Sequence, residues 1–141
     1  MPDARGNQNE AVLVSACLLG VCCRYDGTSR EEPRVIADLA GTRMVPICPE
    51  QMGGLPTPRV PCDLVGGDGA DVLEGRAHVV DKDGVDRTAN FIRGAEESLK
   101  LAQRFGARRA VLKARSPSCG VASGVTAALL RKNGISMESA G

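Results

Sequence analysis

Residues 11–17 read Ala-Val-Leu-Val-Ser-Ala-Cys. A short run of apolar, β-favouring residues is typical of a strand that is buried on both faces, as in a parallel sheet covered by helices. The run ends at Cys17, which therefore begins a loop at the carboxyl end of the strand. This stretch favours an α/β fold and places a cysteine at the edge of its sheet.

The rest of the chain continues the alternation of helix and strand. Ser29 and Glu32 resemble a helix-capping box, and the apolar stripe at 35–39 predicts a helix that Gly41 ends. The clearest helix has Thr88 as its N-cap and ends at Gly106. Further predicted elements are strands at 44–47, 110–112 and 135–138 and a helix at 125–132 that Gly134 ends. The pattern predicts an α/β domain with a mostly parallel sheet flanked by helices in a Rossmann-like, three-layer arrangement.

Two segments do not follow this alternation. Residues 49–71 are rich in Gly and Pro, and we interpret them as a long loop that forms a wall of the active site. Residues 76–80 and Val85 flank Asp81-Lys82-Asp83-Gly84, which predicts a small β-hairpin. Because 141 residues can bury only one core, we expect a single domain at 11–141. The polar residues 1–10 before it predict a flexible N-terminal segment.

The composition excludes several classes of protein. The chain has 18 basic and 17 acidic side chains, a net charge of +1, so it carries no strong signal for nucleic acid. It has neither the start of a secretory signal nor a run of about 20 apolar residues that could span a membrane. We therefore expect a cytoplasmic protein with a small-molecule partner. The sequence leaves its oligomeric state open.

The six cysteines raise the question of metal binding, because stable disulfides are rare in a reducing cytosol. Cys17, Cys48 and Cys119 each follow a predicted strand, so the three thiols could meet in one crevice. Thiolates are the preferred ligands of iron–sulfur clusters, but buried, inert thiols explain the same pattern equally well. Structural zinc is less favoured, because the chain has no Cys-x-x-Cys pair and its only histidine is His78.

Several motifs, in order along the chain, resemble the thiouracil desulfidase family, long catalogued as a domain of unknown function. The match runs from about Val12 to Glu138. The motifs are Ser15-Ala16-Cys17-Leu18-Leu19-Gly20, Cys23-Arg24-Tyr25-Asp26-Gly27, Cys48-Pro49-Glu50, Gly53-Gly54-Leu55-Pro56-Thr57-Pro58-Arg59, Leu112-Lys113, Ser116-Pro117-Ser118-Cys119-Gly120 and Gly124-Val125-Thr126-Ala127-Ala128-Leu129-Leu130.

The resemblance implies an enzyme with a [4Fe-4S] cluster that is held by three cysteines and has one open iron. By motif, the ligands are Cys17, Cys48 and Cys119, with Cys23 as the alternative ligand. The cluster-dependent reaction would convert thiouracil-type bases or nucleosides to the oxo form and release sulfide without electron transfer. The resemblance thus predicts a small thiolated pyrimidine as substrate.

Other residues of these motifs are candidates for the chemistry. Glu50 is the candidate general acid/base, although it could instead pair with Arg59 or cap the next turn. Ser116 and Ser118 could orient substrate or water, or simply satisfy the turn that contains them. For substrate binding the candidates are Arg24 and Arg59, of which Arg24 could instead form a surface ion pair.

The chain departs from the family pattern after Cys119. Family members usually carry a glycine-rich insertion before the last helix, whereas only Val121-Ala122-Ser123 intervene here. This shorter connection motivates an alternative function, a non-catalytic module that binds a cluster, a metal or a thiobase.

Overall fold

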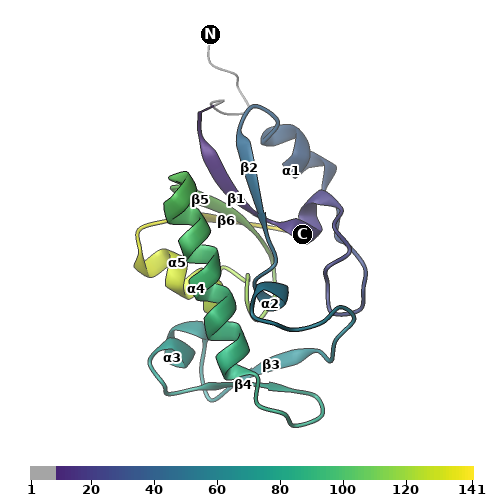
Figure 1. Ribbon diagram of the computed structural model, residues 1–141, viewed down its shortest axis with the longest axis vertical. Helices are drawn as coiled ribbons and strands as arrows, with labels where there is room; N and C mark the ends of the chain where they lie inside the picture. Colours follow the sequence, from purple (N-terminus) through teal and green to yellow (C-terminus); the bar gives the residue numbers. More distant parts are fainter. Residues whose placement is uncertain (1–8) are drawn as a thin grey trace.

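Two β-sheets organise the chain in the computed structural model, which describes residues 9–141 (Figure 1). Of the N-terminal segment predicted to be flexible, residues 1–8 lie outside the described residues. The elements are β1 (Ala11–Ser15), a 3-10 helix η1 (Ala16–Leu19), α1 (Pro33–Asp38), β2 (Arg43–Ile47), α2 (Pro49–Met52), β3 (Cys62–Val65), α3 (Gly69–Leu73), β4 (His78–Asp81), α4 (Thr88–Phe105), β5 (Arg109–Lys113), α5 (Val125–Lys132) and β6 (Ser136–Ala140).

The larger sheet has four strands in the order β2-β1-β5-β6, and every neighbouring pair is parallel. β1 is buried along its whole length, as its apolar sequence predicts for a central strand. Parallel strands place their carboxyl ends on one edge of a sheet. The residues that follow β1, β2 and β5 therefore converge.

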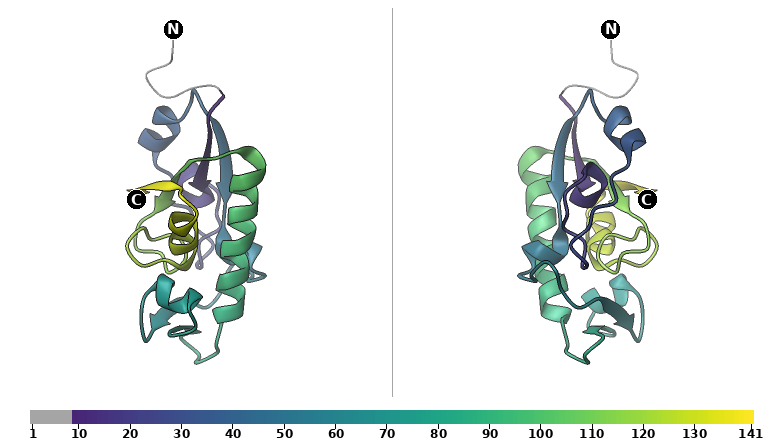
Figure 2. Two further views of the ribbon diagram at one scale, coloured as in Figure 1. Left: turned by 90° about the vertical axis from the view of Figure 1, so that its left-hand side faces the viewer. Right: turned by 90° about the vertical axis from the view of Figure 1, so that its right-hand side faces the viewer.

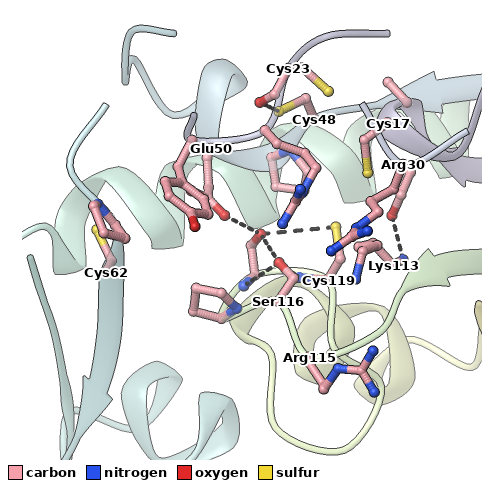
Figure 3. Close-up of a pocket in the computed structure, with 18 of the residues that line it drawn as sticks. Cys17, Cys23, Arg30, Cys48, Glu50, Cys62, Lys113, Arg115, Ser116 and Cys119 are labelled. Atoms are coloured by element: carbon pink, nitrogen blue, oxygen red, sulfur yellow. Dashed lines mark hydrogen bonds between the residues drawn. The ribbon is translucent and has the colours of Figure 1, made fainter. Parts of the chain in front are cut away.

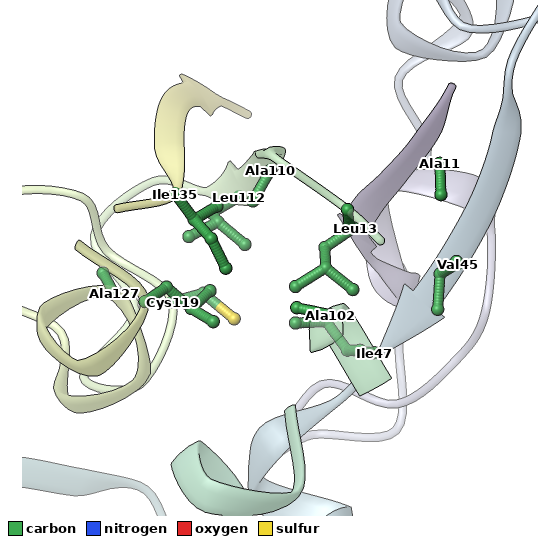
Figure 4. Packing of buried hydrophobic residues seen from close by; sticks show 12 residues of the cluster. Ala11, Leu13, Val45, Ile47, Ala102, Ala110, Leu112, Cys119, Ala127 and Ile135 are labelled. Atoms are coloured by element: carbon green, nitrogen blue, oxygen red, sulfur yellow. The ribbon is translucent and has the colours of Figure 1, made fainter. Parts of the chain in front are cut away.

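Helices cover both faces of this sheet, which confirms the three-layer prediction (Figure 2). On one face, side chains such as Leu13 and Leu112 pack with α4 and α5, as Figure 4 shows. On the other face, Val12 and Val14 pack with η1 and with Val35 of α1. α4 ends at Gly106, whose φ of 69° is left-handed, as predicted for that glycine.

The prediction of a long loop at 49–71 is wrong, because this segment contains α2, β3 and the start of α3. β3 pairs antiparallel with β4. The predicted hairpin around 81–84 is also present, because the Asp81 N–H donates to the carbonyl of Val85 at 2.9 Å and an antiparallel bridge joins Val80 to Asp86. The polar residues after β3 start a helix, since the side chain of Asp68 accepts a hydrogen bond from the backbone N–H of Asp71.

Two predicted helix starts are also wrong. α1 begins at Pro33 with Glu32 as its N-cap, and no side-chain cap forms, so Ser29 and Glu32 make no capping box. α4 has Arg87 at its N-cap, because the Thr88 hydroxyl instead accepts a hydrogen bond from the Val79 N–H. A long-range contact thus takes the hydroxyl that a local pattern assigned to the helix.

Candidate active site

A cavity of about 390 Å³ opens at the carboxyl ends of β1, β2 and β5 (Figure 3). All the residues that were predicted from the sequence to form the site line this cavity: Cys17, Cys23, Arg24, Cys48, Glu50, Arg59, Ser116, Ser118 and Cys119. Cys62 lines it too, although Figure 3 shows it apart from the other thiols. The exposed Cys22 is not among the lining residues.

The four cysteines that gather here come from three connections of the sheet. Cys17 lies in η1 directly after β1, and Cys48 is the N-cap of α2 directly after β2. Cys119 lies in the turn between β5 and α5, and its sulfur points toward that of Cys17 in Figure 3. Cys23, in the loop after η1, is only 3% exposed.

Two glycines set the position of α2, which carries Glu50. A Cβ atom at Gly94 would overlap the carbonyl oxygen of Pro49, and one at Gly53 would overlap the carbonyl oxygen of Asn90. The backbones of α2 and α4 are therefore in direct contact, and the Asn90 amide further donates to the carbonyl of Gly53 at 2.8 Å. Only glycine permits the two helix backbones to lie this close, so the contact with α4 fixes the position of α2 and of its residue Glu50 at the cavity.

The thiols differ in how readily they become thiolates. A hydrogen bond from Cys23 lowers the pKa of Cys17 below its usual value, and the same contact raises the pKa of Cys23. The pKa of Cys48 is raised by a hydrogen bond with Cys23 and by burial. Burial raises the pKa of Cys119 to about 12. Cys17 is thus the thiol that most easily carries negative charge.

The donors that line this cavity include thiols, which are the preferred ligands of iron–sulfur clusters. Among residues 9–141, no three His, Cys, Asp or Glu side chains are arranged to hold one metal ion. A single zinc ion draws its thiolates to about 2.3 Å from one centre, whereas an iron–sulfur cluster spreads them over separate irons.

Glu50 is held by two partners from distant parts of the chain. Its Oε1 accepts a hydrogen bond from Nε of Arg59 at 3.0 Å, and its Oε2 accepts one from the Ser118 hydroxyl at 2.9 Å. The side chains of Glu50 and Arg59 are only 13% and 5% exposed. The pairing with Arg59 that the sequence left open is present, and it leaves the other carboxylate oxygen in contact with the Cys119 turn.

The Arg59 side chain makes four hydrogen bonds. Beyond Glu50, its guanidinium donates to the carbonyls of Cys23 and Pro56 and to the hydroxyl of Thr57. These contacts use four of the five N–H donors of a guanidinium. Arg59 therefore ties the loop after Cys23 to α2.

The hydroxyls of the two serines of the Cys119 turn lie 3.0 Å apart, within hydrogen-bond distance, and their other partners differ. The Ser116 hydroxyl accepts hydrogen bonds from the backbone N–H groups of Ser118 and Cys119 at 3.2 and 3.0 Å, so it shapes the turn. The Ser118 hydroxyl lies 3.9 Å from the Cys119 sulfur and donates to Glu50. Only Ser118 connects the carboxylate to a thiol.

The cavity also contains residues that sequence reasoning did not single out. Ser15, the last residue of β1, accepts a hydrogen bond from the Lys113 N–H, and its hydroxyl also contacts the Cys119 thiol and favours the thiolate. The Lys113 ammonium donates to two carbonyls, and burial lowers its pKa. Both residues belong to the quoted motifs, but neither stands in a spacing that indicates chemistry.

Arg24 forms part of the cavity wall and is held by its own loop. Its guanidinium donates to the Thr28 hydroxyl at 3.2 Å and lies 3.9 Å from a carboxylate oxygen of Asp26. The ion pair that the sequence allowed is therefore present, and Arg24 still lines the cavity.

Comparison with known proteins gives consistent matches. The family model described as 2-thiouracil desulfurase matches residues 12–140. The uncharacterized protein YbbK of Bacillus subtilis (strain 168) is 39% identical over 137 residues, which cover 87% of this chain and 91% of YbbK. A solved structure of the [4Fe-4S]-dependent thiouracil desulfidase TudS is similar with a TM-score of 0.76 and 39% identity, covering 92% of this chain and 90% of that one. None of the helices within 9–141 has the length and apolar content needed to cross a bilayer.

Proposed function

Because the chain belongs to the 2-thiouracil desulfurase family, we propose that it hydrolyses thiouracil-type bases or nucleosides to the oxo form and releases sulfide. The observation that carries this proposal is the contact of the Glu50 carboxylate with Ser118, beside the thiol of Cys119 in one cavity. Water replaces sulfur on the ring carbon, so no electron needs to be supplied.

We propose that Cys17, Cys48 and Cys119 hold a [4Fe-4S] cluster with one iron free of protein ligands. When bound, the cluster supplies a Lewis acid next to the carbon–sulfur bond. Thiols must lose their protons to bind metal, so the raised pKa values of Cys48 and Cys119 mean that loading releases protons into solvent. Cys23 is then a fourth thiol beside the ligands.

Glu50 performs the proton transfers in this proposal. Its carboxylate takes one proton from the attacking water as the oxygen bonds to the ring carbon, and gives that proton to the sulfur. The carbon–sulfur bond then breaks and hydrosulfide leaves, while the carboxylate takes the second water proton as the new carbonyl forms and releases it to solvent. The hydrogen bonds from Arg59 and Ser118 fix both oxygens of the carboxylate, so it is oriented before substrate enters. Ser116 acts by holding the turn.

The two arginines are proposed to contribute differently to substrate binding. Arg59 acts mainly by orienting Glu50, and its remaining N–H can meet a substrate oxygen. Arg24 places positive charge on the wall of the cavity. We place this reaction in the cytoplasm, because all six cysteines are free and stable disulfides are rare in a reducing cytosol.

The test is anaerobic reconstitution with iron and sulfide, followed by incubation with 2-thiouracil. We expect equal amounts of uracil and sulfide, and a Glu50→Gln variant with the same cluster absorbance and a rate lower by about 10²–10⁴-fold. Absence of product from all thiolated pyrimidine bases and nucleosides would contradict the proposal. If wild type and Glu50→Gln both bind the thiobase without turnover, the protein is the non-catalytic module.

A further inference from the structure

Tyr25 is a large side chain at the cavity to which the proposed chemistry assigns no role. It lines the cavity and is 40% exposed. Among the lining residues in the described part of the chain, it alone is aromatic. A planar heterocycle can stack on an aromatic face, which the thiols and the carboxylate of the cavity do not offer.

The backbone of Tyr25 is fixed relative to Glu50. The carbonyl of Tyr25 accepts a hydrogen bond from the Arg59 N–H at 2.7 Å, and the Arg59 side chain holds Glu50. The turn around Tyr25 is closed by hydrogen bonds between the backbones of Arg24 and Thr28 and of Gly27 and Arg24. The ring is therefore carried by a loop that is already ordered before substrate binds.

Arg24 determines which face of the ring can be used. Its guanidinium carbon lies 5.7 Å from the centroid of the Tyr25 ring, so a cation covers one face. The opposite face is the one on which a planar ligand can stack. A cation on one side and a heterocycle on the other is a favourable arrangement for an aromatic ring.

We propose that Tyr25 is the platform on which the pyrimidine ring stacks, so that the carbon–sulfur bond points to the thiols and Glu50. This inference rests on the proposed function and deepens it, because it assigns the recognition of the flat ring. The contact exists equally in the substrate and in the product. It should therefore set binding rather than the rate of the chemical step.

The experiment compares Tyr25→Leu and Tyr25→Phe in the reconstituted holoprotein with 2-thiouracil. We expect Tyr25→Leu to raise KM about tenfold with little change in kcat, and Tyr25→Phe to behave like wild type. Phe105→Leu is the matched control, since Phe105 is similarly exposed, at 46%, but is not among the residues that line the cavity. Cluster absorbance checks that each variant is loaded. An unchanged KM in Tyr25→Leu, or equal damage in Tyr25→Phe, overturns the inference.

A second readout is independent of turnover. Tyr25 is the only tyrosine and the chain has no tryptophan, so its fluorescence reports this residue alone. We expect 2-thiouracil to quench it in Glu50→Gln holoprotein, and an emission that does not change overturns the stacking. If wild type forms no uracil but this quenching is seen, the desulfidase proposal fails while the ring platform stands.

Discussion

The Ser118 hydroxyl donates a hydrogen bond to Oε2 of Glu50 at 2.9 Å, across 68 positions of sequence. The same hydroxyl lies 3.9 Å from the sulfur of its neighbour Cys119. The turn that brings Cys119 into the cavity therefore also orients the carboxylate. The Ser116 hydroxyl, two residues earlier, accepts hydrogen bonds from the backbone of that turn and lies 3.0 Å from the Ser118 hydroxyl.

Ser118→Ala and Ser116→Ala should fail in different ways. Loss of a hydrogen bond to a charged group costs about 1.5–3 kcal/mol, so we expect Ser118→Ala to lower kcat at least about tenfold with its iron content unchanged. Ser116→Ala should weaken the turn and lower iron content and the melting temperature instead. Steady-state kinetics, iron analysis and thermal unfolding of both variants are the measurements, and indistinguishable variants would contradict these roles.

The proposed ligand set predicts how single cysteine variants divide. Cys17→Ala, Cys48→Ala and Cys119→Ala should each lose the cluster, whereas Cys23→Ala and Cys62→Ala should retain it. Iron and acid-labile sulfide per protein, measured after anaerobic reconstitution, report this directly. If Cys23→Ala loses iron as fully as Cys119→Ala, Cys23 is a ligand and the three-thiol set is wrong.

Gly94→Ala tests the contact between α2 and α4. Helix propensity alone would stabilise this variant by about 0.8–1 kcal/mol. The new Cβ instead meets the carbonyl of Pro49, and overpacking of this kind costs about 1–3 kcal/mol, so we expect a lower melting temperature and a lower kcat as Glu50 shifts. The exposed Glu96→Ala on the same helix is the control. A Gly94→Ala variant more stable than wild type would rule out the tight contact.

The carboxylate of Asp81, at the end of β4, should make the stability of the hairpin around residues 81–85 depend on pH. Its side chain is 2% exposed and accepts hydrogen bonds from the N–H groups of Asp83 and Val85 and from Arg87, and mainly the Val85 bond lowers its pKa. Its stabilising effect is present above the unfolded-state pKa of about 3.9 and is lost as pH falls through the lower folded-state pKa.

Asp81→Asn should therefore melt at a lower temperature than wild type at neutral pH. The gap between the two should narrow as pH falls below about 4, because wild type then loses the same charge. Thermal unfolding across this range measures the gap. A gap that stays constant with pH would show that the charge of Asp81 does not stabilise the hairpin.

Much of the site could be predicted because it depends on the parallel sheet. Once residues 11–16, 44–47 and 110–112 are assigned as parallel strands, Cys17, Cys48 and Cys119 each follow a strand and could meet at one edge; the structure places all three at one cavity. The strand and helix patterns were sufficient for that step. The roles within the edge depend on contacts such as that of Ser118 with Glu50, which no local pattern contains.

The errors have a common physical cause. β3 is a four-residue strand whose partner β4 follows a further helix, so its pairing is a tertiary contact that turn-rich composition concealed. Thr88 has a hydroxyl suited to a helix cap, but the backbone N–H of Val79 lies close to it in the fold and donates a hydrogen bond to it. Ser15 and Lys113 were missed because their link is a hydrogen bond between β1 and β5, which are far apart in the sequence.

Arg59 gives the cavity a mechanical property that its separate residues lack. One guanidinium holds both the carbonyl of Cys23 and the carboxylate of Glu50, so the loop and the short helix behave as one stiff body. A ligand pressing on the loop must therefore displace the carboxylate as well. The pocket should therefore have its shape before a ligand binds, and it should select ligands that fit that shape rather than close around them.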